Sequence, residues 1–297
     1  MKILVTGKEG QLARALLALS GADGGVSVTA LGRPALDLTN RDSVIRAIEA
    51  ERPDILVNAA AYTAVDQAEK DVDMAFAVNR DGAGHAAFAA HEAGIPIIHI
   101  STDYVFAGDK PVPYSESDPT GPTGIYGHSK LEGEIAVAEA NPAHAILRTA
   151  WVYSPYGNNF LKTMLRLAQD RDVVRVVADQ HGTPTYAPDI ADGIIAAART
   201  ILADPDGDKW RGVFHMVAEG ETNWAGFAQE IFARSAEAGG PSARVEPIPA
   251  SEYPTLAKRP ANSRLATTRF STAYDHSLPH WQDGVRRCVN ELLQSKI

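Results

Sequence analysis

Short apolar runs alternate with longer amphipathic segments through the first half of the chain. The apolar runs predict strands over residues 3–5, 26–31, 55–57, 95–100 and 145–147. Segments rich in Ala, Leu and Glu predict helices over residues 11–19, 43–51, 74–93 and 126–140. Strands and helices in alternation indicate a parallel sheet covered on both faces. We expect an α/β fold with a Rossmann-type doubly wound sheet, whose ligand crevice lies at the carboxyl ends of the strands.

The second half of the chain is less regular. The pattern predicts helices over residues 189–202, 223–237 and 281–293 and strands over 173–177 and 213–217, separated by proline-rich loops. We expect residues 1–150 to form a dinucleotide-binding domain. Residues 151–297 are expected to form a smaller, partly discontinuous substrate-binding lid, with some segments returning to the first domain.

Composition narrows the class of protein. The 297 residues include 45% hydrophobic residues and carry a net charge of −9, which argues against nonspecific nucleic-acid binding. The single cysteine, Cys288, excludes an intrachain disulfide and a cysteine-based zinc cluster. The chain runs directly into an apolar strand, and its most apolar later stretch, residues 193–203, is too short to cross a bilayer. We therefore expect a cytoplasmic protein.

A glycine-rich turn follows the first predicted strand and opens the first helix. Its sequence is Gly7-Lys-Glu-Gly10-Gln11-Leu12. The glycines permit a tight turn and close approach of a pyrophosphate to the backbone, while the helix N-terminus supplies free N–H groups. The alternative is a purely structural turn, but the motifs downstream favour a dinucleotide site.

The end of the second strand bears on the choice of dinucleotide. An NAD-selective enzyme often places an acidic residue there to hold the ribose hydroxyls. This chain has Gly32 and Arg33 instead, and Arg33 could pair with a 2′-phosphate, so NADPH is favoured with NADH as the alternative. Asp37 and Leu38 suit the edge and face of an adenine ring.

Small side chains close the third strand. In Ala59-Ala60-Ala61-Tyr62-Thr63 the alanines would let the ribose and phosphates of a cofactor lie against the backbone. A tightly packed strand end would also favour alanine, so this segment supports the cofactor site only together with the other motifs.

Tyr126 and Lys130 provide the candidate chemistry. They lie four residues apart in a predicted helix, which places both on one face. A nearby cation favours a phenolate, so we expect Lys130 to lower the pKa of Tyr126 towards the range useful for proton transfer. Thr102, at the end of the fourth strand, could donate a hydrogen bond to a substrate carbonyl oxygen. The alternative for the pair is a solvated helix surface.

The motifs resemble those of the extended short-chain dehydrogenase/reductase superfamily, and in particular the dTDP-4-dehydrorhamnose reductases. The matching segments are KEGQL (8–12), RPDILVNAAAYTAVD (52–66), STDYVF (101–106), RTAWVY (148–153), GNNF (157–160), DQHGTP (179–184) and RPANSRL (259–265). They cover nearly the whole chain, including the expected lid.

The resemblance implies a reaction and roles for further residues. It implies hydride transfer from NADPH or NADH to C4 of dTDP-4-dehydro-β-L-rhamnose, giving dTDP-L-rhamnose. Tyr126 would donate the proton, Lys130 would hold the nicotinamide ribose and Thr102 would polarise the ketone. Further candidates for substrate binding are Asp103, Val105, Phe106, Trp151, Lys258, Arg259 and Arg264. The last three would neutralise the diphosphate, and Asp103 could instead cap the turn that follows it.

Three alternatives stay open at this stage. An epimerase or dehydratase of the same superfamily would recycle a tightly held cofactor, although no second acid follows Asp103, as it would in a dehydratase. A non-catalytic regulatory subunit, such as the one that resembles these reductases in methionine adenosyltransferase, would bind a partner.

Some relatives bridge a metal between subunits with an acid on the first helix. Ala13-Arg14-Ala15 lacks that acid, so we expect no metal site, leave a role for Mg²⁺ open, and expect a monomer or weak homodimer.

Overall fold

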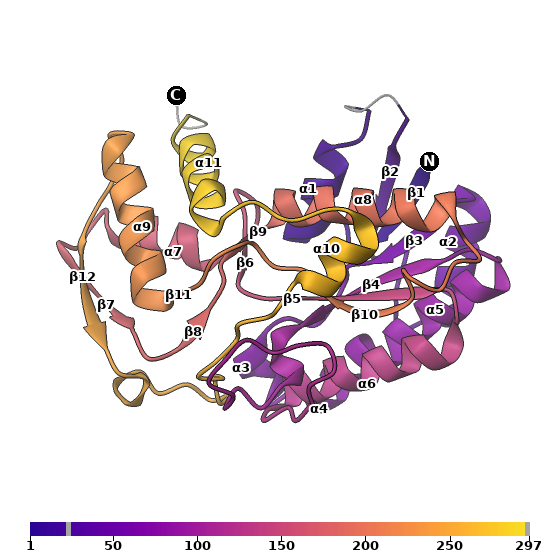
Figure 1. The fold of residues 1–297 in the computed structure, drawn as a ribbon, viewed down its shortest axis with the longest axis horizontal. Coiled ribbons are helices and arrows are strands. Elements are labelled where there is room, and N and C mark those ends of the chain that lie inside the picture. The colour runs from indigo at the N-terminus through magenta and orange to yellow at the C-terminus, as the bar shows by residue number, and fades with distance from the viewer. Residues whose placement is uncertain (22–24, 295–297) are drawn as a thin grey trace.

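The centre of the protein is a six-stranded parallel sheet (Figure 1). The computed structural model describes residues 1–21 and 25–294. The strands are β1 (Lys2–Thr6), β2 (Ser27–Leu31), β3 (Ile55–Asn58), β4 (Ile97–Thr102), β5 (His144–Thr149) and β10 (Gly212–His215), in the spatial order β2-β1-β3-β4-β5-β10. The chain leaves β1 towards β2 and continues with β3 on the other side of β1, so the order reverses there. The doubly wound α/β fold is confirmed, and its switch point lies between β1 and β3.

Helices cover both faces of this sheet (Figure 1). On one face lie α1 (Gln11–Ala18) and α8 (Ala187–Ala203), and on the other α2 (Arg41–Glu51), α5 (Gly82–Glu92) and α6 (Ile125–Ala140). Successive strand residues point to opposite faces. Ile3 and Val5 therefore pack with α1 and α8, whereas Leu4 packs with α2 and α5.

The single helix predicted over residues 74–93 is interrupted in the structure. It consists of α4 (Val72–Phe76), a π-helical turn η1 (Ala77–Asp81) and α5. The turn brings the carbonyl oxygen of Asn79 against Gly133 of α6, so closely that a Cβ at Gly133 would overlap it. Single π-helical turns of this kind occur frequently at functional sites.

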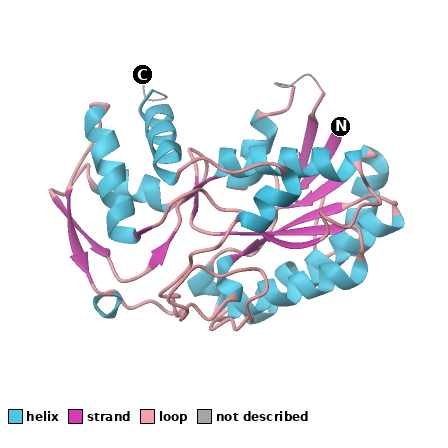
Figure 2. Ribbon diagram, in the orientation of Figure 1, coloured by secondary structure: helices cyan, strands magenta, loops and turns pink. Residues whose placement is uncertain are grey.

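Other elements from the second half of the chain form a second body at the left of Figure 1. Helices α7 (Phe160–Leu167), α9 (Trp224–Glu237) and α11 (Trp281–Gln294) enclose a second hydrophobic cluster. Three pairs of short strands flank them, as Figure 2 shows: β7 (Val173–Val177) with β12 (Arg244–Ile248), β8 (His181–Gly182) with β11 (Thr222–Asn223), and β6 (Val152–Tyr153) with β9 (Thr185–Tyr186). The short elements are α3 (Val65–Ala68), α10 (Thr268–Tyr274), η2 (Asp103–Val105) and η3 (Ala250–Glu252).

Segments from the second half of the chain also join the first body. β10 pairs with β5 at the edge of the sheet, and α8 packs beside α1. Within residues 1–21 and 25–294, no helix is long and apolar enough to cross a membrane.

The contact between Gly133 and Asn79 leads to a stability prediction. Gly133→Ala places a methyl group against a backbone carbonyl, so we expect the free energy of unfolding to fall by about 1–3 kcal/mol. Urea denaturation followed by tryptophan fluorescence measures this change. Gly25→Ala is the control, because a Cβ there meets no atom within 4 Å. Equal losses in the two variants would contradict the prediction.

Candidate active site

The glycine-rich turn lies at the switch point of the sheet. Gly7 has φ = +91° and its N–H donates to the carbonyl oxygen of Leu31 at 2.8 Å. A Cβ at Gly7 would also lie 3.2 Å from the Cβ of Ala60. Only glycine adopts this conformation readily, and only glycine leaves the space between the turn and the end of β3.

The first turn of α1 presents amide groups to open space. Gly10 is the N-cap and supplies no side-chain hydrogen bond, and the first helical bond runs from Arg14 N to Gly10 O at 3.0 Å. The N–H groups of the three residues between them therefore have no partner within the helix. A Cβ at Gly10 would meet no atom within 4 Å. Free donors at the positive end of the helix fit the diphosphate of a dinucleotide.

Gln11 links this turn to the second body. Its Oε1 accepts hydrogen bonds from Ser154 Oγ at 2.7 Å and from Asn159 Nδ2 at 2.9 Å. The side chain therefore holds the segment after β6, whereas the backbone N–H of Gln11 is one of the groups without a partner within the helix. This link was not predicted from the sequence.

The residues after β2 separate into exposed and buried positions. Arg33 is exposed, and its charge helps to lower the pKa of Asp37, although hydrogen bonds from Thr39 are the larger cause. Gly32 lies against the backbone N of Lys8 in the glycine turn. Leu38 is buried in the hydrophobic core, and its carbonyl oxygen contacts His85 Nδ1 at 2.9 Å. The burial of Leu38 contradicts its predicted contact with the face of an adenine ring, whereas Arg33 is accessible to a ligand.

The loop after β3 is held by a residue that the sequence analysis missed. Asn79 accepts a hydrogen bond from Tyr62 N at 2.8 Å and donates to Tyr62 O at 3.1 Å and to Ser129 Oγ at 2.9 Å. Ala59, Ala60 and Ala61 are half-buried and Thr63 is exposed. Asn79 therefore ties the expected cofactor loop to α6.

Thr102 and Tyr126 come together at the carboxyl end of β4. The Thr102 hydroxyl interacts with the Tyr126 phenol and donates a hydrogen bond to Asp103 Oδ1 at 2.9 Å. The ring of Tyr104 meets that of Tyr126 edge to face, with centroids 5.4 Å apart. This proximity depends on Gly127, where a Cβ would overlap the carbonyl oxygen of Tyr104. The structure thus brings Thr102 and Tyr126 together, and their catalytic roles stay a prediction.

Lys130 lies one turn further along α6 and points into the protein. Its Nζ donates to the carbonyl oxygen of Ile100 at 2.7 Å and lies 3.3 Å from Nε2 of His99. Burial lowers the pKa of Lys130 to about 8, against the opposing charge of Glu134. Burial also raises the pKa of Tyr126, and its interaction with Thr102 only partly offsets this rise. The expected lowering of the Tyr126 pKa by Lys130 is therefore wrong for the free protein, because burial dominates.

Two predicted pocket residues lie in the core. Val105 and Phe106 are 0% and 2% exposed, and Phe106 stacks on Tyr114 with centroids 4.3 Å apart. Both side chains belong to a buried hydrophobic cluster and are not exposed to line a sugar pocket, which corrects the expectation from the sequence. Trp151 is half-buried and adopts φ = +50°, a rare conformation for a bulky residue. Its ring stacks on Trp224 with centroids 3.7 Å apart.

The three predicted diphosphate ligands differ in their engagement. Arg259 pairs with Asp66 and donates to the Tyr104 hydroxyl at 3.1 Å. Arg264 pairs with Glu221 at 3.1 Å and also donates to the Pro111 carbonyl. Lys258 is exposed and forms no ion pair within the described part of the chain. It lines a hollow formed by Gln180, Ala250, Tyr253, Pro254, Thr255, Leu256, Ala257, Lys258 and Arg259.

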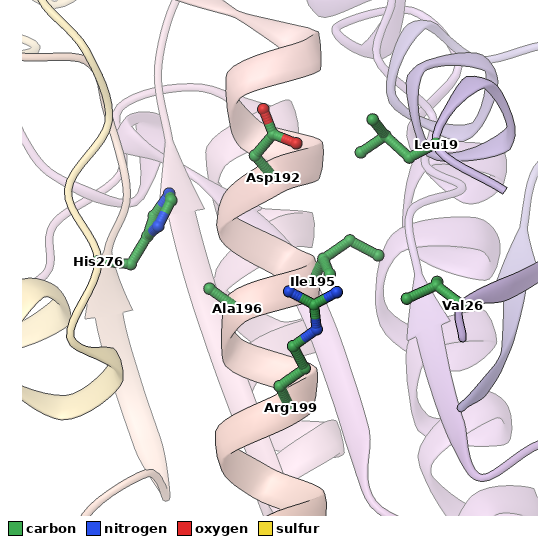
Figure 3. Close-up of a pocket in the computed structure, with 7 residues that line it drawn as sticks. All are labelled: Leu19, Val26, Asp192, Ile195, Ala196, Arg199 and His276. Carbon is green, nitrogen blue, oxygen red and sulfur yellow. The ribbon is translucent and has the colours of Figure 1, made fainter. Parts of the chain in front are cut away.

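A separate hollow lies on the outer side of α8 (Figure 3). It is lined by Leu19, Val26, Asp192, Ile195, Ala196, Arg199 and His276, none of which the sequence analysis assigned to a site. Among the described residues, no group of three or more His, Cys, Asp or Glu side chains is placed to hold a metal ion. None of the candidate catalytic residues Thr102, Tyr126 and Lys130 lines this hollow.

Asp103 makes the stability of the protein depend on pH. Burial raises its pKa from 3.8 to about 6, and hydrogen bonds from Ser263 and Thr102 oppose the shift. A group with a raised pKa stabilises the fold fully below its unfolded value and loses that contribution as the pH rises through its folded value. We expect Asp103→Asn to be more stable than the wild type at neutral pH, by up to about 3 kcal/mol. The difference should disappear below about pH 4.

Urea denaturation at neutral and acidic pH measures the effect of Asp103→Asn. The wild type serves as the reference at each pH, so acid effects shared by both proteins cancel. A difference in unfolding free energy that stays constant between the two conditions would contradict the assignment.

Comparison with known proteins places this geometry in a family. The family described as RmlD substrate binding domain matches residues 1–294. A dTDP-4-dehydrorhamnose reductase of Sinorhizobium fredii is 52% identical over 293 residues, which cover 99% of this chain and 98% of that protein. The solved structure of dTDP-4-dehydrorhamnose reductase from Bacillus anthracis in complex with NADP has a TM-score of 0.89 and 36% identity, covering 98% of this chain and 99% of that one.

A more distant structure shares the fold alone. UDP-glucose 4-epimerase from Thermus thermophilus in complex with NAD has a TM-score of 0.78 at 20% identity, and the similarity covers 100% of both chains. The stronger matches extend over nearly the whole chain, through both bodies of the structure. The chain therefore belongs to the dTDP-4-dehydrorhamnose reductase family.

Proposed function

We propose that this protein is an NADPH-dependent reductase that converts dTDP-4-dehydro-β-L-rhamnose to dTDP-L-rhamnose. The observation that carries the proposal is the meeting of Thr102, at the end of β4, with Tyr126 of α6, and Lys130 lies one turn further along α6. The free amides of α1 lie at the same carboxyl edge of the sheet. The sequence identity to named reductases supports the choice of substrate.

The residues at the switch point suit NADPH. Gly7, Gly10 and the backbone of Gln11 and Leu12 would bind the diphosphate, and the loop from Ala59 to Thr63 would lie along the ribose. Arg33 is exposed after β2 and would pair with the 2′-phosphate, and Asp37 would bind beside the adenine. The bound nicotinamide supplies the hydride. The NADP complex of the Bacillus anthracis relative supports this cofactor, and NADH stays the alternative.

The catalytic chemistry follows from the protonation states. The raised pKa of Tyr126 keeps its phenol protonated at neutral pH, as a proton donor requires. The Thr102 hydroxyl would donate to the substrate ketone oxygen and stabilise the negative charge that develops there. As hydride reaches C4, Tyr126 would give its proton to that oxygen. Lys130, with a pKa of about 8, would replace the proton that Tyr126 loses.

The two parts of the chain would divide the binding work. Residues 1–150 would bind the dinucleotide, and residues 151–297 would mainly bind the sugar nucleotide, with α8 and β10 completing the first body. Asp103 and Trp151 would contact the sugar, and Lys258, which lines a hollow with Arg259, would bind the diphosphate. Arg259 and Arg264 would have to exchange Asp66 and Glu221 for the phosphates. We place the enzyme in the cytoplasm as a monomer or weak homodimer.

The consumption of NADPH tests the proposed function. The purified protein is mixed with NADPH and the keto-sugar nucleotide generated from its precursor, and the absorbance of NADPH is followed. We expect oxidation in equal amount to the sugar added. Turnover of a sugar nucleotide with no net NADPH consumption would instead indicate an epimerase or dehydratase that recycles its cofactor.

The proton-donor assignment predicts distinct effects for two variants. Tyr126→Phe removes only the hydroxyl, so we expect kcat to fall by about 10²–10⁴-fold while NADPH still binds. Lys130→Ala should reduce both turnover and NADPH affinity. Steady-state kinetics and fluorescence titration with NADPH separate the two. A near-normal kcat for Tyr126→Phe would show that another group donates the proton.

A further inference from the structure

A chain of buried polar side chains lies beneath the site. Thr6, Asn58 and His99 are neighbours in register across β1, β3 and β4. Register partners in a parallel sheet project from the same face, and Leu4, two residues before Thr6, packs with α5 on that face. None of the three is more than 1% exposed. Their polar atoms must therefore be satisfied within the protein.

The hydrogen bonds along this chain run in one direction. Ala60 N donates to Thr6 Oγ1 at 3.1 Å, so the Thr6 hydroxyl proton is free to donate to Asn58 Oδ1 at 2.6 Å. The amide nitrogen of Asn58 then lies 3.0 Å from Nδ1 of His99. An amide nitrogen can only donate, so Nδ1 accepts and the ring proton of neutral His99 resides on Nε2.

The proton on Nε2 faces Lys130. Nε2 lies 3.3 Å from Lys130 Nζ, which also donates to the carbonyl oxygen of Ile100. An ammonium group has no lone pair and cannot accept a hydrogen bond. An amine can accept one. The tautomer set by Asn58 therefore bonds to Lys130 only when Lys130 has lost a proton.

Other charged and titratable groups around the contact leave this preference in place. Glu134 on α6 favours the ammonium form of Lys130, but it is engaged in a buried pair with Arg148 of β5 at 2.8 and 2.6 Å. The raised pKa of Tyr126 on α6 keeps its phenol neutral, and His144, at the start of β5, acts on His99 through its charge. Burial and the charges of Lys130 and His144 lower the pKa of His99 well below its ordinary value, so the ring stays uncharged.

We propose that His99 is a positioning residue which stabilises the amine form of Lys130 through an Nε2–H group oriented by Thr6 and Asn58. The proposal rests on the proposed function, in which Lys130 restores the proton of Tyr126. The phenolic O–H bond breaks as the C4 oxygen gains its proton. A proton then passes from the Lys130 ammonium to the phenolate, and the remaining amine accepts the His99 hydrogen bond until water returns a proton to it.

The pKa of Lys130 tests the proposal without any turnover. Protein labelled with ¹³C at lysine Cε is titrated by NMR, and the Lys130 signal is assigned by its absence in Lys130→Met. We expect a wild-type pKa near 8. His99→Leu removes the hydrogen bond to the amine, so the Lys130 pKa should rise by about one unit. Asn58→Asp should raise it too, because a carboxylate draws the ring proton to Nδ1 and leaves a lone pair facing Lys130.

His144→Gln is the matched control. It removes the neighbouring titratable ring but leaves the Nε2–H group, so the Lys130 pKa should stay at its wild-type value. An unchanged Lys130 pKa in folded His99→Leu would overturn the proposal. His99→Met, which also lacks the Nε2–H group, decides in the same way where His99→Leu does not fold. In the active enzyme the alkaline limb of kcat should move with the Lys130 pKa.

The outcomes separate this proposal from the proposed function. Failure of the wild type to oxidise NADPH with the keto-sugar nucleotide would reject the reductase assignment, whatever the titration shows. Loss of kcat in His99→Leu at every pH, with the Lys130 pKa unmoved, would reject the positioning role and leave the reductase assignment intact.

Discussion

The site depends on the close contact of α6 with the backbone beneath it. Gly127 lies against the carbonyl oxygen of Tyr104, and Gly133 lies against that of Asn79. A side chain at either position would push the helix away from the sheet. Because both positions are glycine, Tyr126 reaches Thr102 at the end of β4 and Lys130 reaches the carbonyl oxygen of Ile100. Helix position and catalytic geometry are thus set by the same contacts.

Close packing also determines the protonation states. Burial penalises charge, and it raises the pKa of Tyr126 and Asp103 while it lowers that of Lys130 and His99. The free protein therefore holds a neutral phenol beside a lysine that loses its proton readily. Burying ionisable groups lowers the free energy of unfolding, because their charged forms lose contact with water. The apolar clusters on both faces of the sheet offset this loss. Perturbed pKa values of this kind are typical of active sites.

Much of this architecture could be predicted from the sequence, because it depends on local patterns. The strand runs and the Tyr126–Lys130 spacing identify the sheet and one helix face. The direction of the Tyr126 pKa could not be predicted, since it depends on how deeply α6 packs. The ion pair between Arg259 and Asp66 could not be predicted either, because the two residues are far apart in the sequence. His99 is visible in the sequence as a polar residue inside an apolar strand. Its alignment with Thr6 and Asn58 becomes apparent only once the strand register is known.

The central claim is that this site delivers a hydride to C4 of the sugar while the protein supplies the proton. The most direct test uses NADPH deuterated at the transferable position, with the keto-sugar nucleotide in ordinary water. The account predicts a product that carries one deuterium at C4, as read by NMR of the sugar ring. A product with no deuterium at C4, or with deuterium at another carbon, would contradict it.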